Sequence, residues 1–130
     1  MTTEFTVAIP DVPGSLARLG QILGDAGVNI EAIQGFAGGG QGLVRFVPDT
    51  PEPAARALDA AGYAHTRREV LVVHVLDEAG ALGQLALVLA EADINIDAIY
   101  VTTRGHLVLG VDDLTGAIHV AAGMAVMIAD

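Results

Sequence analysis

Two short loops of this chain combine residue types that could bind the charged ends of a small zwitterion. The first is Asp11-Val12-Pro13-Gly14-Ser15-Leu16, and sixty-six positions later stands Asp77-Glu78-Ala79-Gly80-Ala81-Leu82. Each opens an expected helix, whose first backbone N–H groups have no partner within the helix and can hold a carboxylate. The glycine lets a ligand approach the backbone closely. The aspartate is suited to an ammonium group through charge-assisted hydrogen bonds.

An asparagine stands at the start of the strand expected after each of these helices. Asn29-Ile30 returns as Asn95-Ile96, and an asparagine amide can both donate and accept hydrogen bonds. Together these groups describe a receptor for a free α-amino acid. The alternative is structural, because aspartate is common before Pro-Gly turns and asparagine can satisfy neighbouring backbone groups. The residues alone support the two interpretations equally.

The elements that must position these loops follow the same order in each half of the chain, which indicates an internal duplication. Alternating or helical spacing of apolar residues predicts strand, helix, strand, strand, helix and strand in the first half. These are Glu4–Ile9, Ser15–Ala26, Val28–Phe36, Leu43–Val47, Glu52–Ala61 and Tyr63–Glu69. In the second half they are Val70–Val75, Ala81–Ala92, Ile94–Thr103, His106–Val111, Leu114–Ala122 and Met124–Ala129.

The predicted fold class is α+β, with a ferredoxin-like βαββαβ unit repeated at residues 1–69 and 70–130. Each unit would be an antiparallel sheet with both helices on one face. We expect the two sheets to pair edge to edge into one eight-stranded sheet, because pairing hides an open edge of each. Little or no loop is expected between Glu69 and Val70. The helix Ala81–Ala92 is apolar nearly all round, which favours burial against the other copy or against a second chain in a homodimer.

Composition excludes several classes of function. The 130 residues carry a net charge of −10, with 16 acids against six arginines and no lysine, which argues against binding of nucleic acid. The single basic pair, Arg67-Arg68, is expected on a solvated strand or edge. No apolar run approaches the roughly 18–20 residues of a membrane span, and no signal peptide is recognisable. The lack of cysteine excludes thiol chemistry and agrees with a cytoplasmic location.

Other residue patterns point away from catalysis, metals and cofactors. The histidines fall in different expected elements with no close pair, at His65, His74, His106 and His119. The glycine-rich segment Phe36–Gly42 joins two strands and lacks the lysine of a P-loop, so a mobile hairpin loop is expected. Asp112-Asp113 precedes a helix and is expected to cap it; aligning Asp49 with Asp113 makes the second hairpin two residues shorter. Ser15 has Ala81 at the equivalent position, which disfavours a catalytic nucleophile.

The order strand, Asp-x-x-Gly-x-Leu, helix, Gly-Val-Asn-Ile, strand resembles the ACT domain, a βαββαβ regulatory module of amino-acid metabolism. The first half matches through Asp11–Leu16 and Ala26–Ile30, and the second through Asp77–Leu82 and Ala92–Ile96. The resemblance implies a tandem ACT protein, not an enzyme, that binds a small amino acid between units and acts allosterically on a partner in amino-acid metabolism. The site residues it implies are Asp11, Val12, Pro13, Gly14, Ser15, Leu16, Asn29, Ile30, Asp77, Ala79, Gly80, Ala81, Leu82, Asn95 and Ile96.

In such domains a ligand contacts the first loop of one unit and the second strand of its neighbour. Carried over, Asp11–Leu16 would face Asn95-Ile96 or a symmetry mate, and Asp77–Leu82 would face Asn29-Ile30. Pro13 is replaced by Ala79 in the second loop, which leaves open whether both loops bind. The main alternative to an amino-acid-binding protein is a ligand-free module that pairs with an enzyme or a transcription factor. A second alternative is a small ferredoxin-like enzyme.

Overall fold

The computed structural model describes residues 2–124 and 127–128, which fall into two compact units. The first unit spans Thr3–Arg68, and the second begins at Glu69. The boundary expected from the repeat lies one residue further on, between Glu69 and Val70. None of the helices within the described ranges has the length and apolar character of a membrane span.

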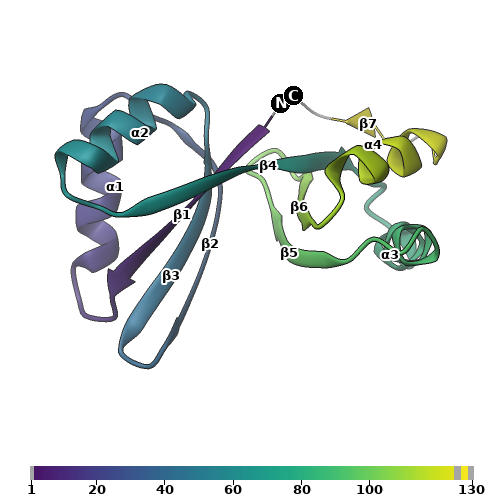
Figure 1. The fold of residues 1–130 in the computed structure, drawn as a ribbon, viewed down its shortest axis with the longest axis horizontal. Coiled ribbons are helices and arrows are strands. Elements are labelled where there is room, and N and C mark those ends of the chain that lie inside the picture. Colours follow the sequence, from purple (N-terminus) through teal and green to yellow (C-terminus); the bar gives the residue numbers. More distant parts are fainter. Residues whose placement is uncertain (1, 125–126, 129–130) are drawn as a thin grey trace. The chain divides into compact units, whose positions relative to one another are not determined.

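The first unit has the βαββαβ order that the sequence predicts. Its elements are β1 (Thr2–Pro10), α1 (Ser15–Asp25), β2 (Ile30–Gly38), β3 (Gln41–Pro48), α2 (Pro51–Ala60) and β4 (His65–His74). The strands are hydrogen-bonded in the order β2-β3-β1-β4, and β3 is antiparallel to both of its neighbours. In Figure 1 both helices lie on the same side of β1, β2 and β3. The ferredoxin-like α+β prediction is confirmed for this unit.

The core of the first unit lies between the sheet and these helices. Leu19 and Leu23, four residues apart on α1, are at most 1% exposed and pack against the inward-facing residues of β1. The rings of Phe5 and Phe46 stack with their centroids 5.5 Å apart, at directly paired positions of β1 and β3. Alternation along the strands and i, i+4 spacing along the helix therefore bury the same core.

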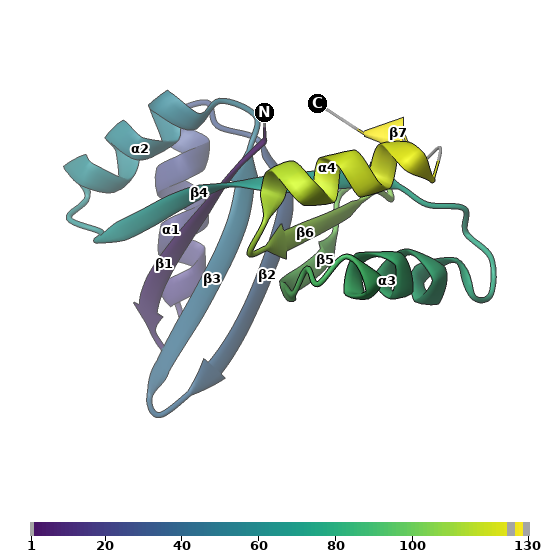
Figure 2. The same cartoon turned by 45° about the vertical axis from the view of Figure 1, so that its right-hand side comes forward.

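The strands that follow β4 in the second unit are shorter than those of the first unit. It continues β4 and adds α3 (Ala81–Glu91), β5 (Ile96–Val101), β6 (Leu107–Val111), α4 (Leu114–Gly123) and β7 (Met127–Ile128). β6 lies between β5 and β4, and β7 pairs with the other edge of β4. Leu85 and Leu89 of α3 and Ala117 and Ala121 of α4 pack with Leu109 of β6, and Figure 2 shows α3 and α4 beside β5 and β6.

The expected eight-stranded sheet is not found. Residues 2–124 and 127–128 contain seven strands, because Tyr63–Glu69 and Val70–Val75 are expected as two strands but form the single strand β4. Its sequence, HTRREVLVVH, contains no glycine, proline or asparagine that would break it. The prediction of little or no loop between Glu69 and Val70 is thereby confirmed. Of the last predicted strand, Met124–Ala129, only Met127–Ile128 is a strand among the described residues; positions 125, 126 and 129 lie outside them.

Candidate functional site

The two predicted binding loops have the same backbone conformation. Gly14 has φ 92° and ψ −15°, and Gly80 has φ 91° and ψ −13°, in the left-handed region that glycine occupies without steric cost. Matching hydrogen bonds surround them: Ser15 N to Val12 O and Ala81 N to Glu78 O, both 3.3 Å, Arg18 N to Gly14 O, 2.9 Å, and Gln84 N to Gly80 O, 3.0 Å. The N-cap residues of α1 and α3 are these two glycines, so neither helix has a side-chain cap on the N–H groups of its first turn.

Both loops are open to solvent. Asp11, Val12, Pro13 and Gly14 are exposed, as are Asp77, Glu78, Ala79 and Gly80. Leu16 and Leu82, at the start of the following helices, are 56% and 49% exposed. In the first unit the N–H of Asp11 donates to the carbonyl oxygen of Gly40 over 3.2 Å, which ties the loop to the β2–β3 hairpin.

Asn29-Ile30 lies at the opposite end of the first unit from Asp11–Leu16. β1 and β2 run in the same direction, because each is antiparallel to β3. Asp11 follows the end of β1 and Asn29 precedes the start of β2, so about one strand length, on the order of 25 Å, separates them. The structure does not bring these groups together within the unit. The predicted pairing of each loop with the asparagine of the other half stays a prediction.

The repeated asparagines share a backbone contact that sequence reasoning missed. The N–H of Asn29 donates to Asp49 Oδ1 over 3.0 Å, and the N–H of Asp49 donates back to the Asn29 carbonyl over 2.9 Å. In the second unit Asn95 and Asp112 form the same pair, at 2.9 and 3.2 Å. Since each reciprocal pair closes the start of β2 or β5 against the end of β3 or β6, these positions have a structural role.

This contact also corrects the alignment of the two halves. Asp49 corresponds to Asp112 and not to Asp113, so the second hairpin is three residues shorter rather than two (112 − 49 = 63, against 66 elsewhere). Asp113 caps α4 as predicted, since its Oδ1 accepts from the N–H of Gly116 over 2.9 Å. Two adjacent aspartates have separate tasks, which spacing alone could not assign.

An apolar hollow of about 410 Å³ lies beside the first loop, and the sequence did not predict it. It is lined by Ile9, Leu16, Ile33, Gly35, Phe36, Ala37, Gly42, Leu43 and Val44. Strand pairing sets Gly35 opposite Val44, and Gly42 opposite Ile9. Since neither glycine has a side chain, the hairpin end of the sheet stays open beside the first turn of α1.

The glycine-rich hairpin is more regular than predicted. β2 extends to Gly38 and β3 begins at Gln41, so only Gly39 and Gly40 form the turn, at φ 63° and 82°. Two consecutive positive φ values are typical of the tight type I′ turn, which favours glycine at both positions. The prediction that the hairpin loop spans Phe36–Gly42 is therefore wrong, because all of these residues except Gly39 and Gly40 are paired strand.

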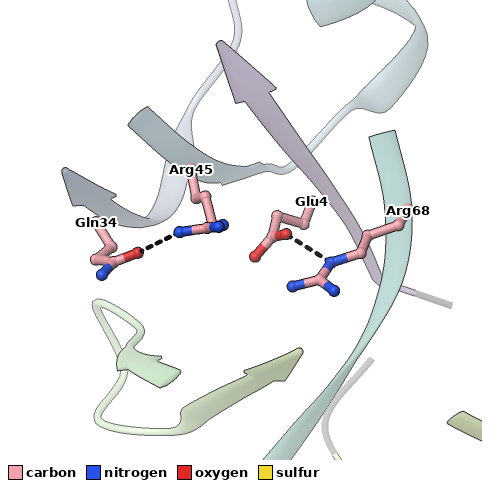
Figure 3. A network of polar contacts seen from close by, with 4 residues as sticks. All are labelled: Glu4, Gln34, Arg45 and Arg68. Atoms are coloured by element: carbon pink, nitrogen blue, oxygen red, sulfur yellow. Dashed lines mark hydrogen bonds and ion pairs between the residues drawn. The ribbon is translucent and has the colours of Figure 1, made fainter. Parts of the chain in front are cut away.

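A row of polar contacts crosses the sheet of the first unit (Figure 3). Glu4 on β1 is 1% exposed, and its Oε1 accepts from Arg68 Nε on β4 over 2.9 Å. Arg45 on β3 donates to Gln34 Oε1 of β2 over 3.4 Å, between directly paired residues. We assign these contacts a structural role, because they join neighbouring strands of the sheet.

The basic pair Arg67-Arg68 is expected at a solvated position, and the two arginines differ in this respect. Arg67 is exposed and contacts the exposed Glu52 at 2.8 Å. Arg68 instead forms an ion pair with the buried carboxylate of Glu4.

The histidines are less scattered than expected. His74 at the end of β4 and His106 just before β6 meet edge to face, with ring centroids 5.3 Å apart, because β4 and β6 are neighbours. The sequence shows no close pair because 32 positions separate these two histidines (106 − 74 = 32). His65 instead contacts Asp59 at 2.8 Å. Within the described ranges, no three histidine or acidic side chains are grouped so that they could hold a metal ion.

Comparisons with solved structures agree with this fold. Solved structures with the same fold include a protein of Bacteroides thetaiotaomicron, with a TM-score of 0.91 and 18% identity over 99% of this chain and 92% of that one. The ligand-free regulatory subunit of aspartate kinase from Thermus thermophilus has a TM-score of 0.73 and 20% identity over 94% and 91%. Its counterpart from Thermus flavus has a TM-score of 0.69 and 19% identity over 94% and 90%. No curated protein matches the sequence.

The family comparison is confined to the first unit. The model of the ACT domain matches residues 3–61, which include the Asp11–Leu16 loop, the Asn29–Asp49 contact and the hollow, and it does not extend into the second unit. An ACT domain is therefore found by similarity at residues 3–61, which make up a little less than half of the chain.

Proposed function

We propose that this chain is a regulatory protein that binds a free amino acid at interfaces between ACT-like units. The observation that carries the proposal is the left-handed glycine turn, Gly14 and Gly80, repeated at the N-termini of two helices that lack side-chain caps. In this proposal the N–H groups of the first helical turn hold the ligand carboxylate, which the helix dipole also favours. The exposed carboxylate of Asp11 or Asp77 holds the ammonium group.

The second unit is, in this proposal, a divergent second ACT repeat. Support comes from its element order, from the matching loop, and from the Asn95–Asp112 contact that reproduces Asn29–Asp49. Its divergence lies mainly in side chains, because Pro13 becomes Ala79 while the backbone turn persists. Ligand binding would change the activity of a partner only by the difference between its affinities for two states.

Assembly is part of the proposal. Exposed apolar side chains gather on α3 and β5, where Leu82, Leu87, Ile99 and Val101 are 40–58% exposed. Such side chains are suited to contact with a second chain. A regulatory subunit of aspartate kinase is among the proteins of similar fold, and we propose an enzyme or regulator of amino-acid metabolism as the partner here.

A thermal-shift screen of the twenty amino acids tests the binding proposal. A ligand that binds only the folded state adds about 2.7 kcal/mol at a hundredfold excess over its dissociation constant, so a true ligand raises the melting temperature. Asp11→Asn and Asp77→Asn should reduce the shift. Asp25→Asn, at the far end of α1, is the matched control and should leave it unchanged.

The apolar surface of the second unit favours one alternative, a ligand-free interaction module. Under that alternative no amino acid shifts melting, and Leu87→Gln, which introduces the residue that the first unit has at Gln21, weakens assembly. Size-exclusion chromatography with light scattering measures this directly. A strict monomer in the unaltered chain would contradict the homodimer.

A further inference from the structure

The hollow of the first unit is chemically uniform. Each of its nine lining residues is apolar or glycine. Its volume of about 410 Å³ falls within the roughly 300–1,000 Å³ that is typical of small-molecule pockets. Since no side chain in its wall could satisfy a buried polar group, the hollow favours a hydrocarbon group over a hydroxyl, amide or charge.

The hollow adjoins the proposed contact for the charged end of the ligand. Ile9 and Leu16 line it, and in sequence they lie on either side of the Asp11–Gly14 loop. The Asp11–Gly40 hydrogen bond joins this loop to the β2–β3 hairpin, which supplies most of the lining residues. A molecule anchored on the loop thus has apolar space beside its anchor.

We infer that the amino acid bound by the first unit has a bulky apolar side chain, aliphatic or aromatic, and that this side chain fills the hollow. The inference rests on the proposed function and adds the chemical class of the ligand. The hydrophobic effect favours binding roughly in proportion to the apolar area buried, which gives larger side chains the advantage.

The second unit differs at the position that keeps the hollow open. Gly35 on β2 pairs with Val44, whereas its counterpart on β5, Val101, pairs with Leu107 and is 56% exposed. A valine side chain thus stands where the first unit has none. In this inference only the first unit prefers amino acids with large apolar side chains.

Calorimetric titration of the full chain tests the inference directly. Leucine, isoleucine, methionine and phenylalanine should bind at least about tenfold more tightly than glycine, serine or aspartate, since one methylene in an apolar pocket is worth about 10–200-fold. Equal binding of the small or polar amino acids would overturn this inference and leave the proposed function standing. No binding of any amino acid would overturn both.

Gly35→Val brings the residue of the second unit into the hollow. A Cβ at Gly35 would lie 3.6 Å from the Leu43 carbonyl oxygen and 3.8 Å from Val44 Cγ2, ordinary contact distances, and the backbone there needs no positive φ. The variant should fold and bind leucine at least about tenfold more weakly. Gly38→Val, on the same strand with nothing within 4 Å and outside the hollow, is the matched control.

Gly35→Ala is the milder variant if valine disturbs the strand, and circular dichroism establishes which variant is folded. A folded Gly35→Val protein that binds leucine as tightly as the unaltered chain would show that the hollow does not hold the side chain. The same conclusion would follow if Gly38→Val weakened binding equally.

Discussion

The two units share their backbone turns and differ in what fills their cores. Where the first unit buries Phe5 and an ion-paired Glu4 on β1, the second has Leu71 and Val70 on β4, also buried. The left-handed glycines at the two loops nevertheless agree within a degree in φ. Glycine at a positive φ has no substitute of equal energy, whereas one apolar side chain can replace another of similar volume. The two units therefore have the same backbone conformation at this glycine, although the side chains buried in their cores differ.

The largest loss of stability should come from truncating the leucine that α1 and α3 each bury in the core of their own unit. Leu19→Ala and Leu85→Ala remove equivalent side chains, each 1% exposed, and each should cost about 2–5 kcal/mol of unfolding free energy, depending on how far the site collapses. Urea denaturation followed by circular dichroism gives the loss, and hydrogen exchange shows which unit is affected. A loss below about 1 kcal/mol for either would mean that its helix is not held as described.

The buried ion pair should rank next, and only in the first unit. Arg68→Ala takes away a partner of the buried Glu4, and we expect a loss of about 2–3 kcal/mol, below the usual ~3–5 because Arg68 also reaches solvent. Arg67→Ala breaks the exposed pair with Glu52 and should cost about 1 kcal/mol or less. Equal losses in the two variants would contradict the distinction.

Replacement of the turn glycines tests what the units share. Gly14→Ala and Gly80→Ala force a side chain into the left-handed conformation, at roughly 1–2 kcal/mol each. Nothing lies within 4 Å of a Cβ at either position, so the cost should be conformational and similar in both. Denaturation midpoints measure it. A cost in one unit alone would show that the turns are not equivalent.

The smallest effect should separate the second helices. Asp113 caps α4 through Gly116, whereas Thr50 makes no side-chain cap on α2. Asp113→Ala should therefore cost about 1 kcal/mol, and Thr50→Ala should stay close to zero. Thermal melts of the two variants provide the comparison, and equally small losses would show that the cap on α4 does not form.

The candidate site was only partly accessible from the sequence. Asp11, Gly14 and Leu16 could be found because their spacing recurs, and the positive φ of Gly14 agrees with its expected role in a turn. The hollow could not be found, because it depends on strand register. Only the pairing of β1, β2 and β3 puts the bare positions Gly35 and Gly42 beside Leu16.

The sequence by itself determined the element order, the α+β class of the first unit and the turn positions, because hydrophobic periodicity and glycine conformation are local properties. Tertiary structure alone decided that β4 is one strand, that Asp112 rather than Asp113 matches Asp49, and that His74 meets His106. Each of these depends on which strands become neighbours. That choice is made by burial of a whole sheet face, which no short segment contains.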